Sequence, residues 1–117
     1  MQYAILIYDN EATLDAAPAD MMQAYNLYTK ALIDAGVMRG GHELKRVKTA
    51  TSVQVRNGKV HMTDGPFAET REQLGGLYVI ETPSLEEALD WAAKCPSAHI
   101  GTIEVRPLQQ TPAPVPA

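Results

Sequence analysis

The sequence predicts a single α+β domain of the ferredoxin-like class, with two main helices on one face of an antiparallel sheet. Its 117 residues have the length of one domain. Its apolar patterns follow the order strand, helix, hairpin strands, strand, helix, strand, and two helices on one face of such a sheet form this layered fold. Two strands, at residues 2–8 and 77–81, are apolar on both faces. This predicts that two sheets meet back to back in a homodimer.

The first strand and the first helix are predicted from the different spacings of their apolar residues. In residues 2–8, apolar side chains occupy both alternating sets of positions. Residues 9–17 form a polar, alanine-rich connector. Pro18 suits the first position of a helix over residues 18–35, because its missing N–H costs nothing there, and Gly36 supplies the left-handed stop. The apolar stripe of this helix consists of Met21, Tyr25, Tyr28 and Leu32.

The middle of the chain contains a predicted hairpin. Residues 37–50 have the least regular pattern, with an extended start and a break at Gly40-Gly41. Residues 52–56 and 59–63 alternate apolar and polar side chains around Asn57-Gly58, which suits a type I′ turn because that turn needs positive φ twice. The predicted inward face consists of Val53, Val55, Val60 and Met62.

The segment after the hairpin leads to a central strand. Asp64-Gly65-Pro66 turns the chain out of the sheet. Thr70 and Gln73 have the spacing of a capping box, which predicts one short helical turn. Gly75-Gly76 breaks this turn before the strand at 77–81.

The second full helix is predicted between Pro83 and Pro96. Ser84 and Glu87 form its capping box. A last strand follows at residues 100–106, so that a single domain covers residues 1–107. Residues 108–117 form a Pro-rich, flexible tail. The buried stripe of the helix consists of Leu85, Ala88, Leu89, Ala92 and Cys95.

The composition argues against several classes of protein. The formal net charge is −4, and the sequence lacks the dense basic footprint that direct nucleic-acid binding needs. No apolar run approaches about 18 residues, so neither a signal peptide nor a membrane span is predicted. The single cysteine, Cys95, cannot form an internal disulfide, which is typical of a cytoplasmic protein. A packing role is favoured for it over a nucleophilic one.

The sequence shows no motif for a metal or a cofactor. His42, His61 and His99 lie on different predicted elements without the spacing of metal ligands. No phosphate-binding or dinucleotide-binding motif occurs either. We therefore predict no metal site and no cofactor.

The candidate site is the polar segment that follows the hairpin. Asp64 is at a strand end, and Glu69, Arg71 and Glu72 follow within a short element. In a partly desolvated cleft, crowding raises the pKa of a carboxyl group toward neutrality, as a general acid or base requires. Arg71 would hold an anionic group of the substrate. Alternatively, Asp64 caps a turn, the two glutamates face water and Arg71 pairs with one of them.

The segment from Asp64 to Gly76, DGPFAETREQLGG, resembles the DGPF subgroup of the YCII-related family. The opening strand that ends in Tyr8 and the closing segment from Ile103 to Pro107 are also similar to that family. The resemblance covers about residues 2–107. It implies a dimeric α/β-barrel built from two ferredoxin-like halves.

The resemblance also implies a possible chemistry. Some relatives are thought to use an Asp with a His of the first helix as an acid–base pair, in one case to eliminate chloride from an aromatic intermediate. Of that pair only Asp64 is matched here, as the candidate catalytic residue, because Tyr25 or Tyr28 lies where the His would be. The substrate-binding residues implied with it are Tyr25, Gly65, Pro66, Phe67, Glu69, Thr70, Arg71 and Glu72.

Two classes of function stay open from the sequence, and whether the protein is an enzyme is left undecided. The first is a small-molecule site, which either binds its ligand or performs lyase-like acid–base catalysis in a cleft headed by Asp64. The second is a non-enzymatic regulatory or interaction protein. The resemblance supports this second class, because DGPF members are often encoded beside, or fused to, extracytoplasmic-function sigma factors.

Overall fold

The computed structural model describes residues 1–16 and 18–110. Its main sheet has four antiparallel strands in the order β2-β5-β1-β6, and a separate two-stranded sheet is formed by β3 and β4. The main elements are β1 (Gln2–Asp9), α2 (Pro18–Asp34), β2 (Met38–Glu43), β5 (Gln73–Glu81), α3 (Leu85–Ala93) and β6 (Thr102–Pro107). The smaller ones are α1 (Glu11–Ala16), η1 (Val47–Thr49), β3 (Thr51–Arg56), β4 (Lys59–Asp64) and η2 (Pro96–His99).

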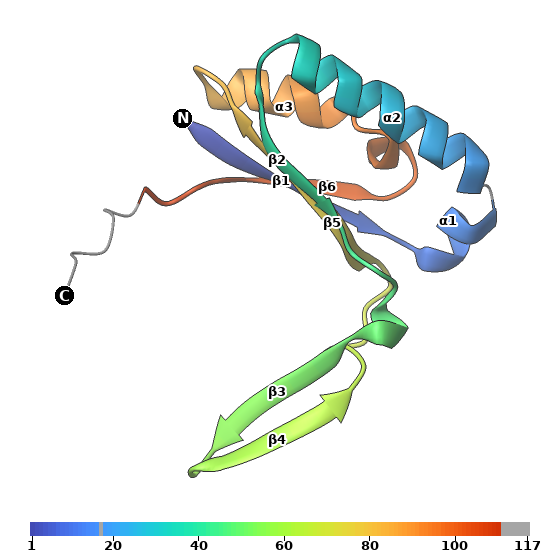
Figure 1. The fold of residues 1–117 in the computed structure, drawn as a ribbon, viewed down its shortest axis with the longest axis vertical. Coiled ribbons are helices and arrows are strands. Elements are labelled where there is room, and N and C mark those ends of the chain that lie inside the picture. Colours follow the sequence, from blue (N-terminus) through green and yellow to red (C-terminus); the bar gives the residue numbers. More distant parts are fainter. Residues whose placement is uncertain (17, 111–117) are drawn as a thin grey trace.

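The two long helices, α2 and α3, lie on the same face of the four-stranded sheet (Figure 1). Leaving the β3–β4 hairpin aside, the order strand, helix, strand, strand, helix, strand and the antiparallel pairing are those of a ferredoxin-like fold. The α+β class predicted from the sequence is therefore confirmed. In the part of the chain that the structure describes, no helix is both long and apolar enough to cross a membrane.

The core lies between the helices and the sheet. Ile5 of β1, Leu32 of α2 and Ile80 of β5 are fully buried. Tyr28 of α2 meets Tyr78 of β5 edge to face, with ring centroids 5.4 Å apart and an interplanar angle of 82°. Cys95, which follows α3, is also fully buried. These contacts fix α2 over the middle of the sheet, which positions the site described below.

Both helices begin and end close to the predicted positions. Helix α2 begins at Pro18 and ends one residue before the predicted bound of 35. Ser84 caps α3, because its side chain accepts a hydrogen bond from the Glu87 N–H. The predicted polar connector at 9–17 is wrong over Glu11–Ala16, which forms α1. The Asn10 side chain accepts from the Thr13 N–H at 3.2 Å and so supports the first turn of α1.

The predicted breaks at the glycine pairs are wrong. Gly40-Gly41 lies inside β2 and Gly75-Gly76 inside β5, and the two strands pair with each other. Glycine is required where they approach closely, because a Cβ on Gly76 would lie 2.8 Å from the His42 carbonyl oxygen. These glycines therefore bring two strands together.

The predicted helical turn at Thr70–Gln73 is also wrong. Local side-chain bonds hold an irregular bend there, with the Thr70 hydroxyl donating to the Glu72 carbonyl and the Gln73 amide donating to the Thr70 carbonyl. Strand β5 begins directly at Gln73. Competition from such local side-chain bonds explains why the capping-box spacing did not produce a helix.

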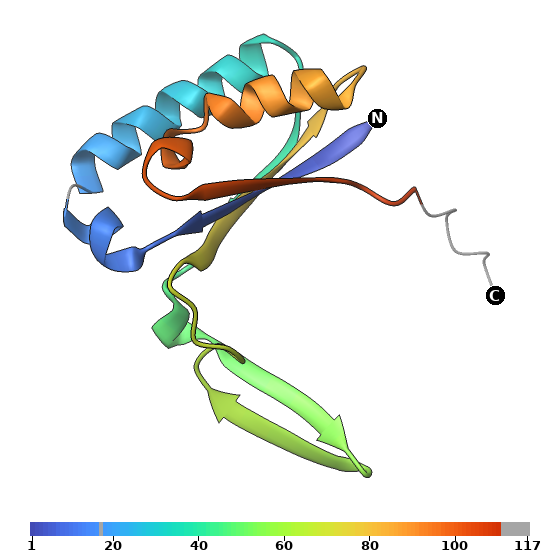
Figure 2. The ribbon, with the colours of Figure 1, turned by 180° about the vertical axis from the view of Figure 1, so that it is seen from behind.

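The β3–β4 hairpin forms as predicted, but its apolar face is not covered. Asn57 and Gly58 both have positive φ, as the turn requires. Figures 1 and 2 show the hairpin extending away from the four-stranded sheet. The side chains predicted to point inward are exposed, at 57% for Val53, 57% for Val55, 58% for Val60 and 71% for Met62. The prediction that they are buried is wrong within one chain.

The end of the described chain follows β6. The Leu108 N–H donates to the Gln2 carbonyl at 2.9 Å, so the chain still contacts the sheet at the first residue of the predicted tail. Residues 111–117, which make up most of that predicted tail, lie outside the described residues.

Candidate functional site

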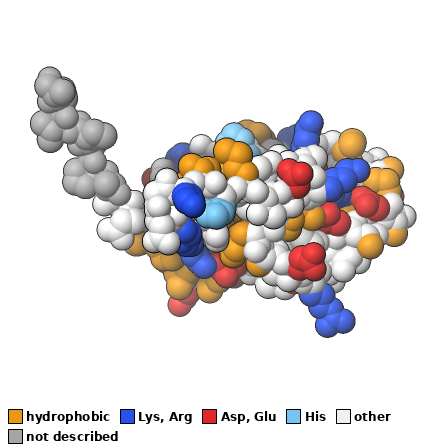
Figure 3. Space-filling model, turned by 90° about the horizontal axis from the view of Figure 1, so that it is seen from below, with side chains coloured by type: hydrophobic (Ala, Val, Ile, Leu, Met, Phe, Trp, Pro, Cys, Tyr) orange, Lys and Arg blue, Asp and Glu red, His pale blue; other side chains and the backbone are white. Residues whose placement is uncertain are grey.

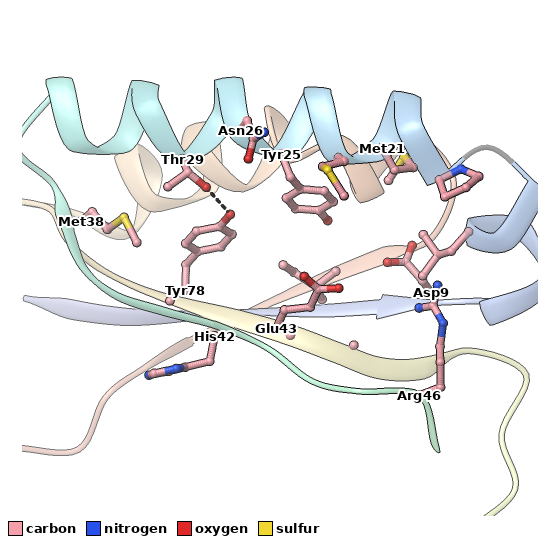
Figure 4. A pocket seen from close by; sticks show the side chains of 17 residues that line it. Asp9, Met21, Tyr25, Asn26, Thr29, Met38, His42, Glu43, Arg46 and Tyr78 are labelled. Atoms are coloured by element: carbon pink, nitrogen blue, oxygen red, sulfur yellow. Dashed lines mark hydrogen bonds between the residues drawn. The ribbon is translucent and has the colours of Figure 1, made fainter. Parts of the chain in front are cut away.

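A cavity of about 370 Å³ lies between α2 and the sheet. Its roof is α2, and its floor is formed by β1, β2 and β5 (Figure 4). Apolar side chains such as Ile7, Met21 and Met38 provide much of the lining. Polar groups of Asp9, Glu43 and other residues reach the same space, which is the usual make-up of a small-molecule site.

The glycines of β2 and β5 help to shape this cavity. Gly41, Gly75 and Gly76 are all part of its lining. A Cβ on Gly41 would lie 3.0 Å from a ring carbon of Tyr78, so glycine leaves room for that ring to lie against β2. The Tyr78 hydroxyl is then within 2.7 Å of the Thr29 hydroxyl of α2. This hydrogen bond joins the roof to the floor at one end of the cavity (Figure 4).

Asp9 lies at the other end, where β1 terminates. Its side chain shares the helix-facing side of β1 with Ile5 and Ile7, and only 4% of the residue is exposed. The Ser97 hydroxyl of η2 donates to Asp9 Oδ2 at 2.7 Å. Because that proton is used, the Ser97 oxygen is left to accept from the Tyr25 hydroxyl, which lies within hydrogen-bonding distance. A chain of hydrogen bonds thus runs from Tyr25 through Ser97 to Asp9.

The second carboxyl oxygen of Asp9 is buried and has no hydrogen-bond partner among residues 1–16 and 18–110. Burial raises the pKa of Asp9, and the Ser97 hydrogen bond opposes this effect. The charge of Glu72 raises this pKa further, whereas the charge of Arg46 lowers it. Asp9 is therefore a carboxyl group that exchanges its proton closer to neutral pH than an exposed aspartate does.

Two tyrosines of the cavity act as hydrogen-bonding phenols. Burial raises the pKa of Tyr25, and the neighbouring Cys95 thiol, 3.5 Å from its hydroxyl, adds to this increase. Burial also raises the pKa of Tyr78. Both side chains consequently keep their protons at neutral pH, so Tyr25 can donate a hydrogen bond but is a poor base.

Charged groups gather around the Asp9 end of the cavity. The guanidinium of Arg46 lies 2.7 Å from the carboxylate of Asp15 in α1. The Glu11 carboxylate accepts from the Val47 N–H at 2.9 Å and so ties α1 to η1. Within the described chain, no group of three or more His, Cys, Asp or Glu side chains is placed to hold a metal ion.

The structure separates the residues that the sequence placed in one site. Tyr25 lines the cavity, whereas Asp64 is exposed at the end of β4. Gly65, with φ of +98°, donates its N–H to the Ala50 carbonyl at 2.7 Å, which fixes the turn at the base of the hairpin. Pro66 and Phe67 line a smaller hollow of about 120 Å³ beside the hairpin, and Phe67 is 87% exposed.

The rest of the predicted motif lies between these two places. Glu69, Thr70 and Arg71 are exposed. The Arg71 carbonyl accepts from the Asn10 side chain at 3.4 Å, and the Glu72 carboxylate accepts from the Thr102 hydroxyl at 2.7 Å. Glu72 is thus the member of the motif whose charge acts on Asp9. A catalytic role for Asp64 stays a prediction.

The sequence reasoning missed Asp9, Ser97 and Glu43. A signal for Asp9 was present, because it continues the alternation of Ile5 and Ile7 and so falls on the core face of the strand. An aspartate is almost never fully buried unless it is paired, so an acidic residue on that face stands out. No comparable signal existed for Ser97, which is 88 residues from Asp9 along the chain.

Comparison with known proteins relates this chain to a family and to an uncharacterized protein. The family described as the YCII-related domain matches residues 1–111 of this chain. An uncharacterized protein of Rhizobium meliloti (strain 1021) is 35% identical over 114 residues, and the match covers 92% of each chain.

Proposed function

Because this chain belongs to the family of YCII-related domains, we propose that it binds a small molecule in the cavity between α2 and the sheet. We place an acid–base group, Asp9, at the end of that cavity opposite the Tyr78–Thr29 hydrogen bond. One observation carries the proposal: a buried carboxyl group lines a cavity of about 370 Å³, and one of its oxygens has no hydrogen-bond partner among the residues that the structure describes. Cavities of roughly 300–1,000 Å³ with a few convergent polar groups are typical of small-molecule sites.

The proposed chemistry is a proton transfer, as in a lyase-type reaction. An ionised Asp9 would take a proton from the ligand, and the protonated Asp9 would return it to another atom of the ligand or to water. Ser97 holds the carboxyl group in place, and Tyr25 orients Ser97. The raised pKa of Asp9 supports this role, because efficient acid–base groups have pKa values near the working pH.

The experiment compares two aspartates in one metabolite screen read by thermal stabilisation. A ligand at 100 times its Kd stabilises a protein by about 2.7 kcal/mol. We expect Asp9→Asn to lose most of this stabilisation and Asp64→Asn to keep it, because only Asp9 lines the cavity. Circular dichroism of both variants serves as the folding control. The reverse result would move the site to the Asp64 turn and contradict the proposal.

A second candidate function is an interaction protein, with an extracytoplasmic-function sigma factor as the partner. The exposed apolar face of the β3–β4 hairpin, defined by Val53, Val55, Val60 and Met62, favours it. If this candidate is correct, a sigma factor copurifies with the wild-type chain and is lost from a Val55→Glu, Met62→Glu variant. Copurification that does not depend on the hairpin would count against it.

A further inference from the structure

We propose that the ligand of this cavity is an amine, which carries its positive charge on an apolar or aromatic body. This inference rests on the proposed function, because it names the class of molecule that the cavity receives.

The lining presents more negative than positive charge. Asp9 and Glu43 both line the cavity, and neither forms an ion pair within the described residues. Arg46, the one arginine among the described residues of the lining, pairs with Asp15 at 2.7 Å, and its charge also acts on Asp9. Asp9 is buried, whereas Glu43 is exposed to solvent. A cationic ligand that displaces water from this space would supply the positive charge that balances both carboxyl groups.

The positions of these side chains agree with that charge balance. Figure 4 shows Glu43 rising from β2 into the space below Tyr25, with Asp9 further along the same space. The side chain of His42, the next residue on β2, points away from it (Figure 4). A cation in the cavity would thus meet the carboxylate of Glu43 on the floor and that of Asp9 at one end.

The walls suit the body of an organic cation. The hydroxyls of Tyr25 and Tyr78 are engaged with Ser97 and Thr29, so their ring carbons are the surface left for a ligand. Aromatic rings attract cations through their quadrupoles. Three methionines, Met21, Met22 and Met38, add polarizable thioethers that adapt to an apolar body.

An anionic ligand would meet a different balance of groups. It would add a third negative charge beside Asp9 and Glu43, and the Arg46 guanidinium would have to leave Asp15 to receive it. Like charges in a partly desolvated site repel strongly. A neutral alcohol of the same shape would fill the apolar space without balancing the carboxyl groups.

The experiment uses three probes of one shape with the full chain: 2-phenylethylamine, 2-phenylethanol and phenylacetate. Binding is followed by NMR chemical-shift changes at pH 7.5. We expect the amine to bind about tenfold more tightly than the alcohol, since a charge-assisted hydrogen bond contributes roughly 1.5–3 kcal/mol. Phenylacetate should bind more weakly than both.

Two charge variants test the origin of this preference. Glu43→Gln should lower the affinity for the amine by about threefold, because Glu43 is exposed, and leave that for the alcohol unchanged. Glu86→Gln, a matched change at an exposed position of α3, should alter neither affinity. The dependence on Glu43 separates recognition of the charge from filling of the apolar space.

Each remaining outcome is decisive. Equal or tighter binding of the alcohol or of phenylacetate in this cavity overturns the amine inference and leaves the proposed function standing. An amine preference that Glu43→Gln leaves undiminished also overturns it. If no probe shifts the cavity resonances and the metabolite screen finds no ligand, the proposed function fails, and this inference fails with it.

Discussion

Asp9 combines three properties that bear on its role. It is buried, one of its oxygens has no partner within the described chain, and it lines a cavity. An unsatisfied buried polar group costs roughly 1–3 kcal/mol. A buried polar group left without a partner therefore calls for an explanation, and the proposed acid–base role supplies one for Asp9.

The pH dependence of stability tests this view of Asp9. Burial raises its pKa in the folded state, so the folded protein holds this proton more tightly than the unfolded chain does. Stability should therefore fall as the pH rises from the unfolded pKa of about 3.9 through the folded value, and level off above it.

The measurement is urea unfolding of the wild type and of Asp9→Asn between pH 4 and 8. We expect the variant to lack this downward slope and to be at least as stable as the wild type at pH 8. Asp34→Asn, which removes an exposed carboxylate of α2, is the control and should leave the slope in place. A wild-type stability that rises steadily over this range would contradict the role of Asp9.

At the scale of elements, the loop between η2 and β6 closes tightly around the end of β1. Gly101 is the residue of closest approach. A Cβ there would lie 2.2 Å from the Tyr8 carbonyl oxygen and 2.6 Å from Asp9 Oδ1. Backbone atoms cannot move aside as a flexible side chain can, so this position requires glycine.

Gly101→Ala should therefore destabilise the fold by about 1–3 kcal/mol, the usual cost of forced overpacking. Chemical unfolding at constant pH measures this loss. Gly40→Ala is the matched control in β2, because its Cβ would meet only Val79 at an ordinary 3.9 Å, and it should cost clearly less. Equal costs for the two variants would show that the close approach at Gly101 is not a constraint.

Elements also show how far the sequence could be used to predict this structure. Capping residues and apolar stripes located α2 and α3, because those signals are local. The alternation in β3 and β4 identified a hairpin. Alternation tells which side chains share a face of the strand, but it does not tell what covers that face. The glycine pairs of β2 and β5 were predicted to be breaks. Glycine is needed there because the neighbouring strand approaches closely, and that strand is distant along the sequence.

The candidate site was harder to predict, because its residues are also brought together from distant parts of the sequence. Asp9, Ser97 and Tyr25 come from a strand end, a short 3₁₀ helix and a long helix, so only the tertiary fold brings them together. The sequence did single out Tyr25. It placed an acidic residue of the site at Asp64, in the most distinctive motif, and that remains a prediction. It overlooked Asp9, whose only signal is one acidic position in an otherwise apolar strand.

At the scale of the whole molecule, two apolar surfaces of one chain are not covered. The face of the sheet opposite the helices presents Leu6, Tyr8, Leu77 and Val79, all half-buried. The hairpin adds its exposed apolar face, and Figure 3, which looks from the hairpin end, shows hydrophobic side chains lying among charged ones. We propose that a second copy of the chain covers the sheet, as the two-faced strands predict.

A homodimer should be evident from mass measurement in dilute solution. Light scattering should give twice the 12.7 kDa of one chain. Leu77→Glu should shift the equilibrium toward single chains, because it places a charge in the proposed interface. Leu27→Glu, an exposed position of α2 on the other side of the sheet, should leave the dimer intact. A wild-type mass of one chain at micromolar concentration would contradict the pairing.

The β3–β4 hairpin contributes no residue to the lining of the larger cavity. A substitution in the hairpin therefore leaves the lining of this cavity as it is. The surface that the hairpin presents can thus be altered independently of the groups that surround the cavity beneath α2.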